Sequence, residues 1–112
     1  MTENEKLTWI AGFFEGEGNF GPNKKKEGRT CPVVQIAQSY RDPLDFIQIY
    51  FGFGKVNGPY GPYKTQTKPY YLYSIYGDNA LEFIDEVMPY LMSKGKQVKE
   101  TLNEYKFEKR NT

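Results

Sequence analysis

One stretch near the start of this 112-residue chain decides the fold: Ile10-Ala11-Gly12-Phe13-Phe14-Glu15-Gly16-Glu17-Gly18. Apolar residues in and before it recur at the i, i+3, i+4, i+7 spacing of an α-helix, at Leu7, Ile10, Ala11 and Phe14. Trp9 and Phe13 lie four positions apart on another side of that helix. The predicted helix is therefore apolar nearly all round and needs cover on more than one face.

Glycines inside the stretch indicate what provides that cover. Gly12 lies within the helix, where glycine costs roughly 1 kcal/mol relative to alanine, and Gly16 follows one turn later. Close packing of two helix backbones explains both residues, and a domain of this size buries only about two thirds of its surface by itself. We expect a dimer interface formed by a second copy at Ile10, Ala11, Gly12 and Phe13. The alternative is an ordinary core helix closed by a Gly-rich cap.

The stretch resembles the LAGLIDADG motif of homing endonucleases at each position. It has an aliphatic residue, Ala, Gly, two bulky apolar residues, an acid, a small residue, a second acid and Gly. In that family the helix packs against a second copy of itself and presents an acid to a divalent metal between two DNA strands. The single motif implies the homodimeric branch, in which each subunit reads one half of a nearly palindromic site.

The resemblance also implies the catalytic residues. Glu17 and the backbone carbonyl of Gly16 would hold Mg²⁺, for which Mn²⁺ can substitute, because hard cations prefer oxygen ligands. Val34-Gln35-Ile36-Ala37-Gln38 resembles the family strand whose closing Gln orders metal-bound water, a role that falls on Gln38. Pro89-Tyr90-Leu91-Met92-Ser93-Lys94 resembles the segment that delivers an active-site lysine, here Lys94. Glu15 is a weaker candidate, because its position in the family is variable and mostly structural.

The rest of the chain predicts an α+β fold with the order αββαββα and a further C-terminal helix. We expect strands over 19–25 and 29–39, a helix between Asp42 and Gly52, and strands over 55–57 and 70–76. A helix from Asp78 and a last helix over 96–109 follow. Residues 1–112 are expected to form one domain, in which the resemblance implies an antiparallel sheet shaped as a DNA-binding saddle. The alternating pattern of 70–76 leaves open which of its two faces is core.

Basic side chains gather in the strand region. Between Gly18 and Tyr76 there are eight basic and three acidic residues, whereas the whole chain has a formal net charge of +1. Such a local excess is typical of a face that contacts phosphates. Residues expected to read DNA from the sheet are Asn23, Lys25, Arg29, Gln35, Lys55 and Asn57. Loop residues expected to hold phosphates are Lys24, Lys26, Lys64 and Lys68.

Several classes of site are excluded by composition. The chain has one cysteine, Cys31, and no histidine, so an internal disulfide, the usual zinc sites and His-based triads are absent. No apolar run approaches the roughly 20 residues of a membrane span, and the acidic start does not resemble a targeting signal. We expect an intracellular protein with access to DNA, in a bacterial or phage cytoplasm or in an organelle.

Together these features favour one function. The chain is expected to be a homodimeric, Mg²⁺-dependent endonuclease that makes a double-strand break in a long DNA target, as part of a mobile intron or intein. The alternative is a splicing cofactor, or maturase, that binds intron RNA with the same fold. A DNA-binding regulator that has lost cleavage is a third reading.

Overall fold

The computed structural model describes residues 1–24, 30–62 and 67–110, and at 22–24, 30 and 104–110 it describes the backbone alone. The elements follow in this order: α1 (Glu3–Glu17), β1 (Gly18–Lys24), β2 (Thr30–Gln38), α2 (Asp42–Phe51), β3 (Lys55–Tyr60), β4 (Tyr70–Tyr76), α3 (Asp78–Val87), the 3-10 helix η1 (Met88–Tyr90) and α4 (Gly95–Arg110). The predicted order of helices and strands is confirmed, with η1 as an added turn.

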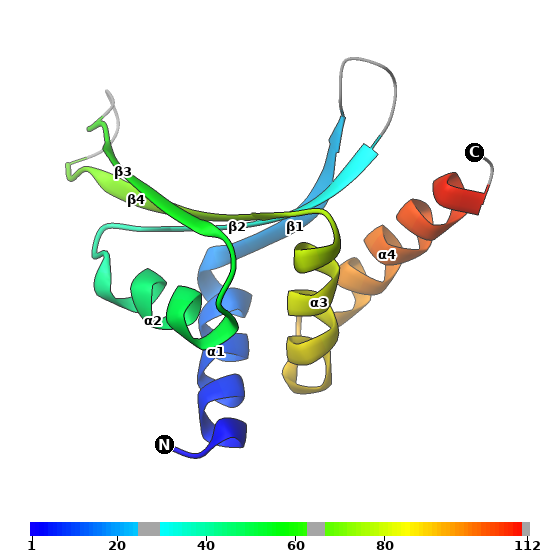
Figure 1. Ribbon diagram of the computed structural model, residues 1–112, viewed down its shortest axis with the longest axis horizontal. Coiled ribbons are helices and arrows are strands. Elements are labelled where there is room, and N and C mark those ends of the chain that lie inside the picture. The colour runs from blue at the N-terminus through cyan, green and yellow to red at the C-terminus, as the bar shows by residue number, and fades with distance from the viewer. Residues whose placement is uncertain (25–29, 63–66, 111–112) are drawn as a thin grey trace.

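The four strands form one antiparallel sheet in the order β1-β2-β4-β3, which confirms the predicted α+β class. Helices α1, α2 and α3 lie against one face of this sheet (Figure 1). The other face carries no helix in the described part of the chain, and it curves upward at both ends like a saddle. The term open face is used below for this second surface.

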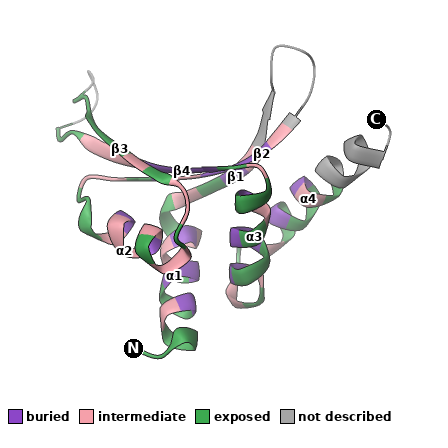
Figure 2. Cartoon of the chain, viewed as in Figure 1, coloured by how far each residue is buried: buried purple, intermediate pink, exposed green. Residues whose placement is uncertain are grey.

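Alternation along the strands builds the core beneath the sheet. In the register, Phe20 lies opposite Val34 and Val34 lies opposite Ile75, and all three side chains are buried. These side chains meet the apolar faces of the helices, where burial is concentrated (Figure 2). The core residues that helices contribute include Ile10, Phe14, Leu44, Ile47, Phe83, Ile84 and Val87.

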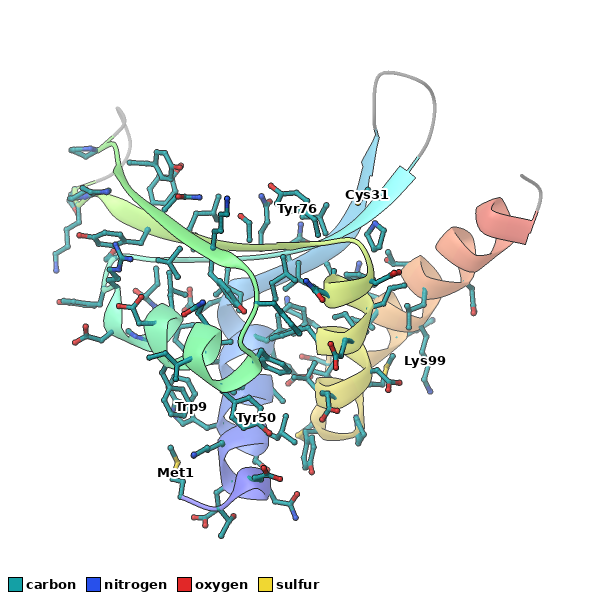
Figure 3. The ribbon with its side chains drawn as sticks, viewed as in Figure 1. Met1, Trp9, Cys31, Tyr50, Tyr76 and Lys99 are labelled. Atoms are coloured by element: carbon teal, nitrogen blue, oxygen red, sulfur yellow. The ribbon has the colours of Figure 1, made fainter. Side chains whose placement is uncertain are left out.

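The structure decides the facing of β4, which sequence alone left open. Tyr73 and Ile75 are buried in the core, whereas Tyr76 is 52% exposed and lies on the open face (Figure 3). The Tyr73 hydroxyl donates a hydrogen bond of 2.8 Å to the backbone carbonyl of Phe53. Burial raises the pKa of Tyr73 well above its ordinary value.

Helix α1 begins at a capping box. The Thr2 hydroxyl accepts a hydrogen bond from the Glu5 N–H at 3.1 Å, and the Glu5 carboxylate accepts one from the Thr2 N–H at 3.0 Å. These two bonds with Thr2 hold the pKa of Glu5 below its ordinary value. The helix then buries Leu7, Ile10 and Phe14 against the chain's own core.

Strand β3 is longer than predicted. The Gly58-Pro59 sequence indicated a loop after Asn57, but the strand continues to Tyr60. It does so across an irregularity in the register, after which Tyr60 pairs with Tyr70. The rings of Tyr60 and Tyr70 lie 5.6 Å apart, and this cross-strand contact supports the extension.

Among the described residues, none of the helices is both long enough and apolar enough to span a bilayer.

Candidate functional site

The junction between α1 and β1 sets the position of Glu17. The helix ends at Glu17, and the chain turns directly into the strand at Gly18, whose N–H bonds to the Phe14 carbonyl. A Cβ at Gly18 would collide with the Phe14 ring and lie 2.9 Å from the Phe14 carbonyl oxygen. Because Phe14 is fully buried and packed on all sides, glycine is the residue that fits this close turn. The exposed Glu17 therefore leaves the helix end at the edge of the sheet.

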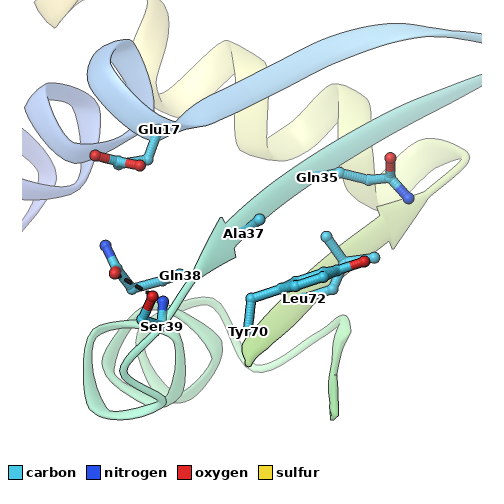
Figure 4. Close-up of a pocket in the computed structure, with 7 residues that line it drawn as sticks. All are labelled: Glu17, Gln35, Ala37, Gln38, Ser39, Tyr70 and Leu72. Carbon is cyan, nitrogen blue, oxygen red and sulfur yellow. Dashed lines mark hydrogen bonds between the residues drawn. The ribbon is translucent and has the colours of Figure 1, made fainter. Parts of the chain in front are cut away.

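Pairing of β1 with β2 brings Glu17 close to the end of β2. Gly18 lies opposite Ile36, so the residue before Gly18 approaches the residue after Ile36. A hollow of about 480 Å³ opens at this place, and its lining is Glu17, Gln35, Ala37, Gln38, Ser39, Tyr70 and Leu72 (Figure 4). Two of the three residues predicted to be catalytic, Glu17 and Gln38, thus share one hollow.

Gln38 presents its amide with a defined orientation. Its side-chain oxygen accepts a hydrogen bond of 2.8 Å from the Ser39 N–H, drawn as the dashed line in Figure 4. With the oxygen engaged, the NH₂ group is left to donate. The hollow thus combines the carboxylate oxygens of Glu17, which accept, with an amide that donates, a pairing suited to a water molecule beside an anion.

Lys94 is not among the residues that line this hollow. It lies in the short segment between η1 and α4, partly buried, and its carbonyl accepts the Val98 N–H at 2.9 Å. Its own N–H donates to Glu15 Oε1 at 3.2 Å. Ser93 N–H donates to the same oxygen at 2.7 Å, and Met92 N–H donates to it as well.

Glu15 therefore carries three backbone hydrogen bonds on one oxygen. Partial removal from water by itself would raise the pKa of Glu15. The N–H groups of Lys94, Met92 and Ser93 and the charge of Lys94 lower the pKa by more than this. The pKa of Glu15 consequently lies below its ordinary value, and the side chain is charged at neutral pH. Sequence reasoning missed this role, because no pattern links residues that are 77 to 79 positions apart.

One chain alone supplies only some of the oxygen ligands that a divalent cation needs. Within 1–24, 30–62 and 67–110 no three acidic or cysteine side chains come together as a metal cluster. Glu17, with the adjacent Gly16 carbonyl, offers oxygen ligands at an exposed helix end. Mg²⁺ is commonly bound by one or two carboxylates together with waters and substrate phosphates, so these residues fit it as a shared, open site.

The open face carries most of the described residues predicted to read DNA. Lys55 and Asn57 lie opposite Ser74 and Leu72 of β4, both are exposed, and Gln35 lines the hollow. No acidic residue occurs in any of the four strands. This surface therefore presents amides and ammonium groups with no carboxylate among its strand residues.

Other predicted DNA contacts divide into three groups. Asn23 and Lys24 occupy the end of β1 opposite Cys31 and Thr30, where only the backbone is described. Lys68 is exposed, and its ammonium lies 5.6 Å from the centre of the Tyr40 ring. The predicted contacts that fall outside the described residues are Lys25, Lys26, Arg29 and Lys64.

The expected dimer interface needs a correction. Ile10 and Ala11 are 0% exposed inside their own chain, so they cannot meet a second copy, and the prediction for these two is wrong. The outward side of α1 instead presents Gly12 and Gly16, and a Cβ at either would meet nothing within 4 Å. Beside them lies Trp9, which is 41% exposed.

A cluster of rings covers part of the same helix. Trp9 stacks on the partly exposed Phe13 with centroids 5.2 Å apart, and it meets the Phe46 ring of α2 edge-on at 5.2 Å. The helix is therefore covered by its own chain on one side and open at a strip of glycines and aromatic rings on the other.

Comparison with solved structures identifies the fold as that of LAGLIDADG homing endonucleases. The homing endonuclease I-CvuI, crystallised with the I-CreI target in the presence of Mg, superposes with a TM-score of 0.73 at 20% identity, over 92% of this chain and 67% of that one. The archaeal intron-encoded I-Vdi141I, complexed with DNA, gives 0.64 at 26% identity, over 87% and 64%. The LAGLIDADG meganuclease I-AabMI, bound to uncleaved DNA, gives 0.72 at 24% identity, over 94% and 37%.

This chain thus spans about two thirds of the length of I-CvuI and I-Vdi141I, and less than two fifths of I-AabMI. No protein-family model and no curated protein matches the sequence.

Proposed function

We propose that this chain is one subunit of a homodimeric, Mg²⁺-dependent homing endonuclease that makes a double-strand break in a long, nearly palindromic DNA target. One observation carries the proposal: Glu17 and Gln38 share a hollow at the edge of an open sheet face whose strands lack carboxylates. The solved structures that share the fold include homing endonucleases bound to DNA, which supports a duplex as the partner.

A pair of chains would supply the second carboxylate that one chain lacks. Each protomer contributes Glu17 at the end of α1, and the glycine side of α1 leaves room for a second helix backbone at Gly12 and Gly16. Two carboxylates brought together in this way repel unless a cation lies between them. I-AabMI supports the pairing indirectly, because a chain in which this fold covers 37% of the length has room for two such units.

Mg²⁺ would be held by Glu17 and the Gly16 carbonyl, and when bound it would neutralise negative charge on the attacking and leaving oxygens of the phosphodiester. The free NH₂ of Gln38 donates to the attacking water or to a phosphate oxygen and thereby orients it. Lys94 does not line the hollow, and its role is taken from the family resemblance of residues 89–94: its ammonium would stabilise the additional negative charge on the phosphate during the reaction. Gln35, Lys55 and Asn57 on the open face contact base edges and phosphates along the groove.

The test is an unbiased selection of cleaved DNA from a randomised library with and without Mg²⁺. We expect cleavage of one nearly palindromic site only when Mg²⁺ or Mn²⁺ is present. Glu17→Gln should bind that site with near-normal affinity, while its cleavage rate falls by about 100-fold or more. Glu82→Gln, at an exposed acid on α3, is the matched control and should cut normally.

The maturase alternative is tested with the same protein. A splicing cofactor would bind a structured intron RNA more tightly than any duplex selected from the library, and Glu17→Gln would leave its splicing activity unchanged. Cleavage by Glu17→Gln at the normal rate would show that Glu17 is not the metal ligand. Tighter binding to RNA than to DNA would favour the maturase alternative.

A further inference from the structure

We infer that Glu15 is a positioning residue that holds Lys94 in place for DNA cleavage, by binding the backbone of the segment that carries this lysine. The inference rests on the proposed function for the role of Lys94. It assigns a task to the first acid of the opening motif, which neither contacts the hollow nor lies in the core.

The first support is the geometry at Glu15. One carboxylate oxygen accepts hydrogen bonds from three consecutive N–H groups, at Met92, Ser93 and Lys94. Successive N–H groups that converge in this way form a concave anion-binding site, and a charged acceptor makes each bond roughly twice as strong as a neutral one would be. The term amide clamp is used below for this set of three bonds.

The second support is the placement of the acid on its helix. Glu15 lies in the last turn of α1, and no basic residue occurs in that turn. A negative charge at the C-terminal end of a helix opposes the helix dipole, so local helix stability does not explain a glutamate there. The three donors from a distant segment do explain it, because their hydrogen bonds stabilise the negative charge.

The third support is that Leu91 packs against the core, whereas Met92 and Ser93, which follow it, are exposed. Residues 91–94 form no helix or strand, and the Met92 side chain is 91% exposed, so it adds little apolar packing. Both backbone polar groups of Lys94 are hydrogen-bonded: its N–H donates to Glu15, and its carbonyl accepts the N–H of the buried Val98 in α4. The amide clamp therefore fixes the backbone from which the lysine side chain projects.

The clamp also couples Lys94 to the metal ligand. Glu15 and Glu17 are two residues apart at the end of one helix. The helix end that presents Glu17 to the hollow therefore also fixes the position of residues 92–94 relative to Glu17. Loss of the clamp should free Lys94 without moving Glu17. The expected defect is thus in the chemical step and not in DNA binding.

A double-mutant cycle on the cleavage rate tests this role. In single-turnover assays with Mg²⁺, Glu15→Ala should lower the rate by about 10-fold to 100-fold, the size usual for a group that orients a functional residue, with DNA affinity nearly unchanged. Glu15→Gln, which keeps an acceptor oxygen without the charge, should fall between Glu15→Ala and the natural protein. In a Lys94→Ala background, Glu15→Ala should have no further effect.

Two controls separate positioning from general damage to the fold. Glu82→Ala removes an exposed acid from α3, and Asn4→Ala removes another link between α1 and η1, the 3.4 Å bond from the Tyr90 hydroxyl. Both should cleave at the normal rate. If Glu15→Ala and Lys94→Ala instead multiply their effects in the double mutant, Glu15 does not act through Lys94 and the inference is wrong.

A second readout does not need nuclease activity. In ¹⁵N-labelled protein, Glu15→Gln and Glu15→Ala should shift the amide signals of Met92, Ser93 and Lys94 upfield and speed their hydrogen exchange, while Val98 stays protected. Unchanged amide signals would overturn the clamp even in an active nuclease. If the natural protein cuts no DNA while these amides respond as expected, the proposed function fails and the contact stands, so the two failures are distinct.

Discussion

Gly18 lies against Phe14 so closely that a side chain at position 18 would have its Cβ 2.7 Å from Phe14 Cε1. The same Cβ would lie 2.9 Å from the Phe14 carbonyl oxygen, while Phe14 itself packs edge-on against Phe83 with centroids 5.4 Å apart. This contact sets the angle at which α1 enters β1, and with it the direction in which Glu17 leaves the helix.

Gly18→Ala should therefore destabilise the protein. Overfilling a packed position costs about 1–3 kcal/mol, so the free energy of unfolding in urea should fall by that amount. Gly21→Ala is the matched control, because a Cβ at Gly21 in the same strand meets nothing within 4 Å. Both variants should be compared at one protein concentration, since association would change the apparent stability. Equal stability of the two variants would show that Phe14 gives way easily.

Gly12→Leu should separate association from folding. Its Cβ enters open space, and leucine favours a helix over glycine by roughly 0.8 kcal/mol, so one chain alone loses no stability. A second helix backbone packed there would be pushed away, and sedimentation should show a shift from dimer to monomer together with loss of cleavage. A variant that remains as strongly dimeric as the natural protein would place the partner elsewhere.

Lys55→Ala and Gln35→Ala should affect DNA binding in different ways. Lys55 is an exposed cation on the open face, and its loss should weaken binding to all sequences and lower the slope of log K against log salt by roughly 1. Gln35→Ala should relax selectivity at one base pair by about 1–3 kcal/mol and leave the salt slope unchanged. Titrations at several salt concentrations measure both.

Lys99→Ala is the control for this pair, because Lys99 is exposed on α4, away from the open face (Figure 3). Its loss should change neither the selectivity nor the salt slope. A full slope change with Lys99→Ala and none with Lys55→Ala would assign the DNA to another surface.

Tyr73 should make the protein sensitive to alkali. Burial raises the pKa of its hydroxyl in the folded chain, so the unfolded chain loses this proton first as the pH rises. The stabilising contribution is complete below the unfolded pKa, about 10, and is lost as the pH climbs from there toward the folded pKa. Unfolding followed by circular dichroism between neutral pH and pH of about 12 should detect this loss.

Tyr73→Phe should weaken this dependence on pH. It leaves the Phe53 carbonyl without its donor and should cost about 1–3 kcal/mol near neutral pH, but its stability should then fall less steeply in alkali. Equal alkaline slopes for the two proteins would mean that another group titrates.

The order of elements could be predicted because helical and alternating periodicities in this chain are separated by clear Gly, Pro and Asp signals. The facing of α1 could not be predicted, because a helix that is apolar nearly all round does not show which side meets the chain's own core and which side meets a partner. For that reason the sequence pattern places Ile10 and Ala11 at a partner interface, whereas the structure buries both inside their own chain. The end of β3 was missed since Gly58 and Pro59 have low strand propensity, and a pairing with β4 overrides it.

The candidate site could be predicted only where short segments of the chain resemble those of a known family. Glu17 and Gln38 were both named from resemblance, and the register of β1 with β2 explains why they meet. The contact of Glu15 with residues 92–94 depends on how α1 packs beside η1, and no local pattern in either segment encodes it. A long-range contact between a side chain and backbone amides cannot be predicted from residue types, because every residue except proline has a backbone N–H.

Residues alternate along the sheet: those that face the helices form the core, and most of those on the open face are at least partly exposed. A change at Lys55 alters an exposed surface while Tyr73 stays buried in the core, and Lys55 is not among the residues that line the hollow beside Glu17. New preferences for a binding partner can thus be acquired by single substitutions, each tolerated on its own. Under the proposed function, a lineage of such chains can change its DNA target while Glu17 and Gln38 stay the same.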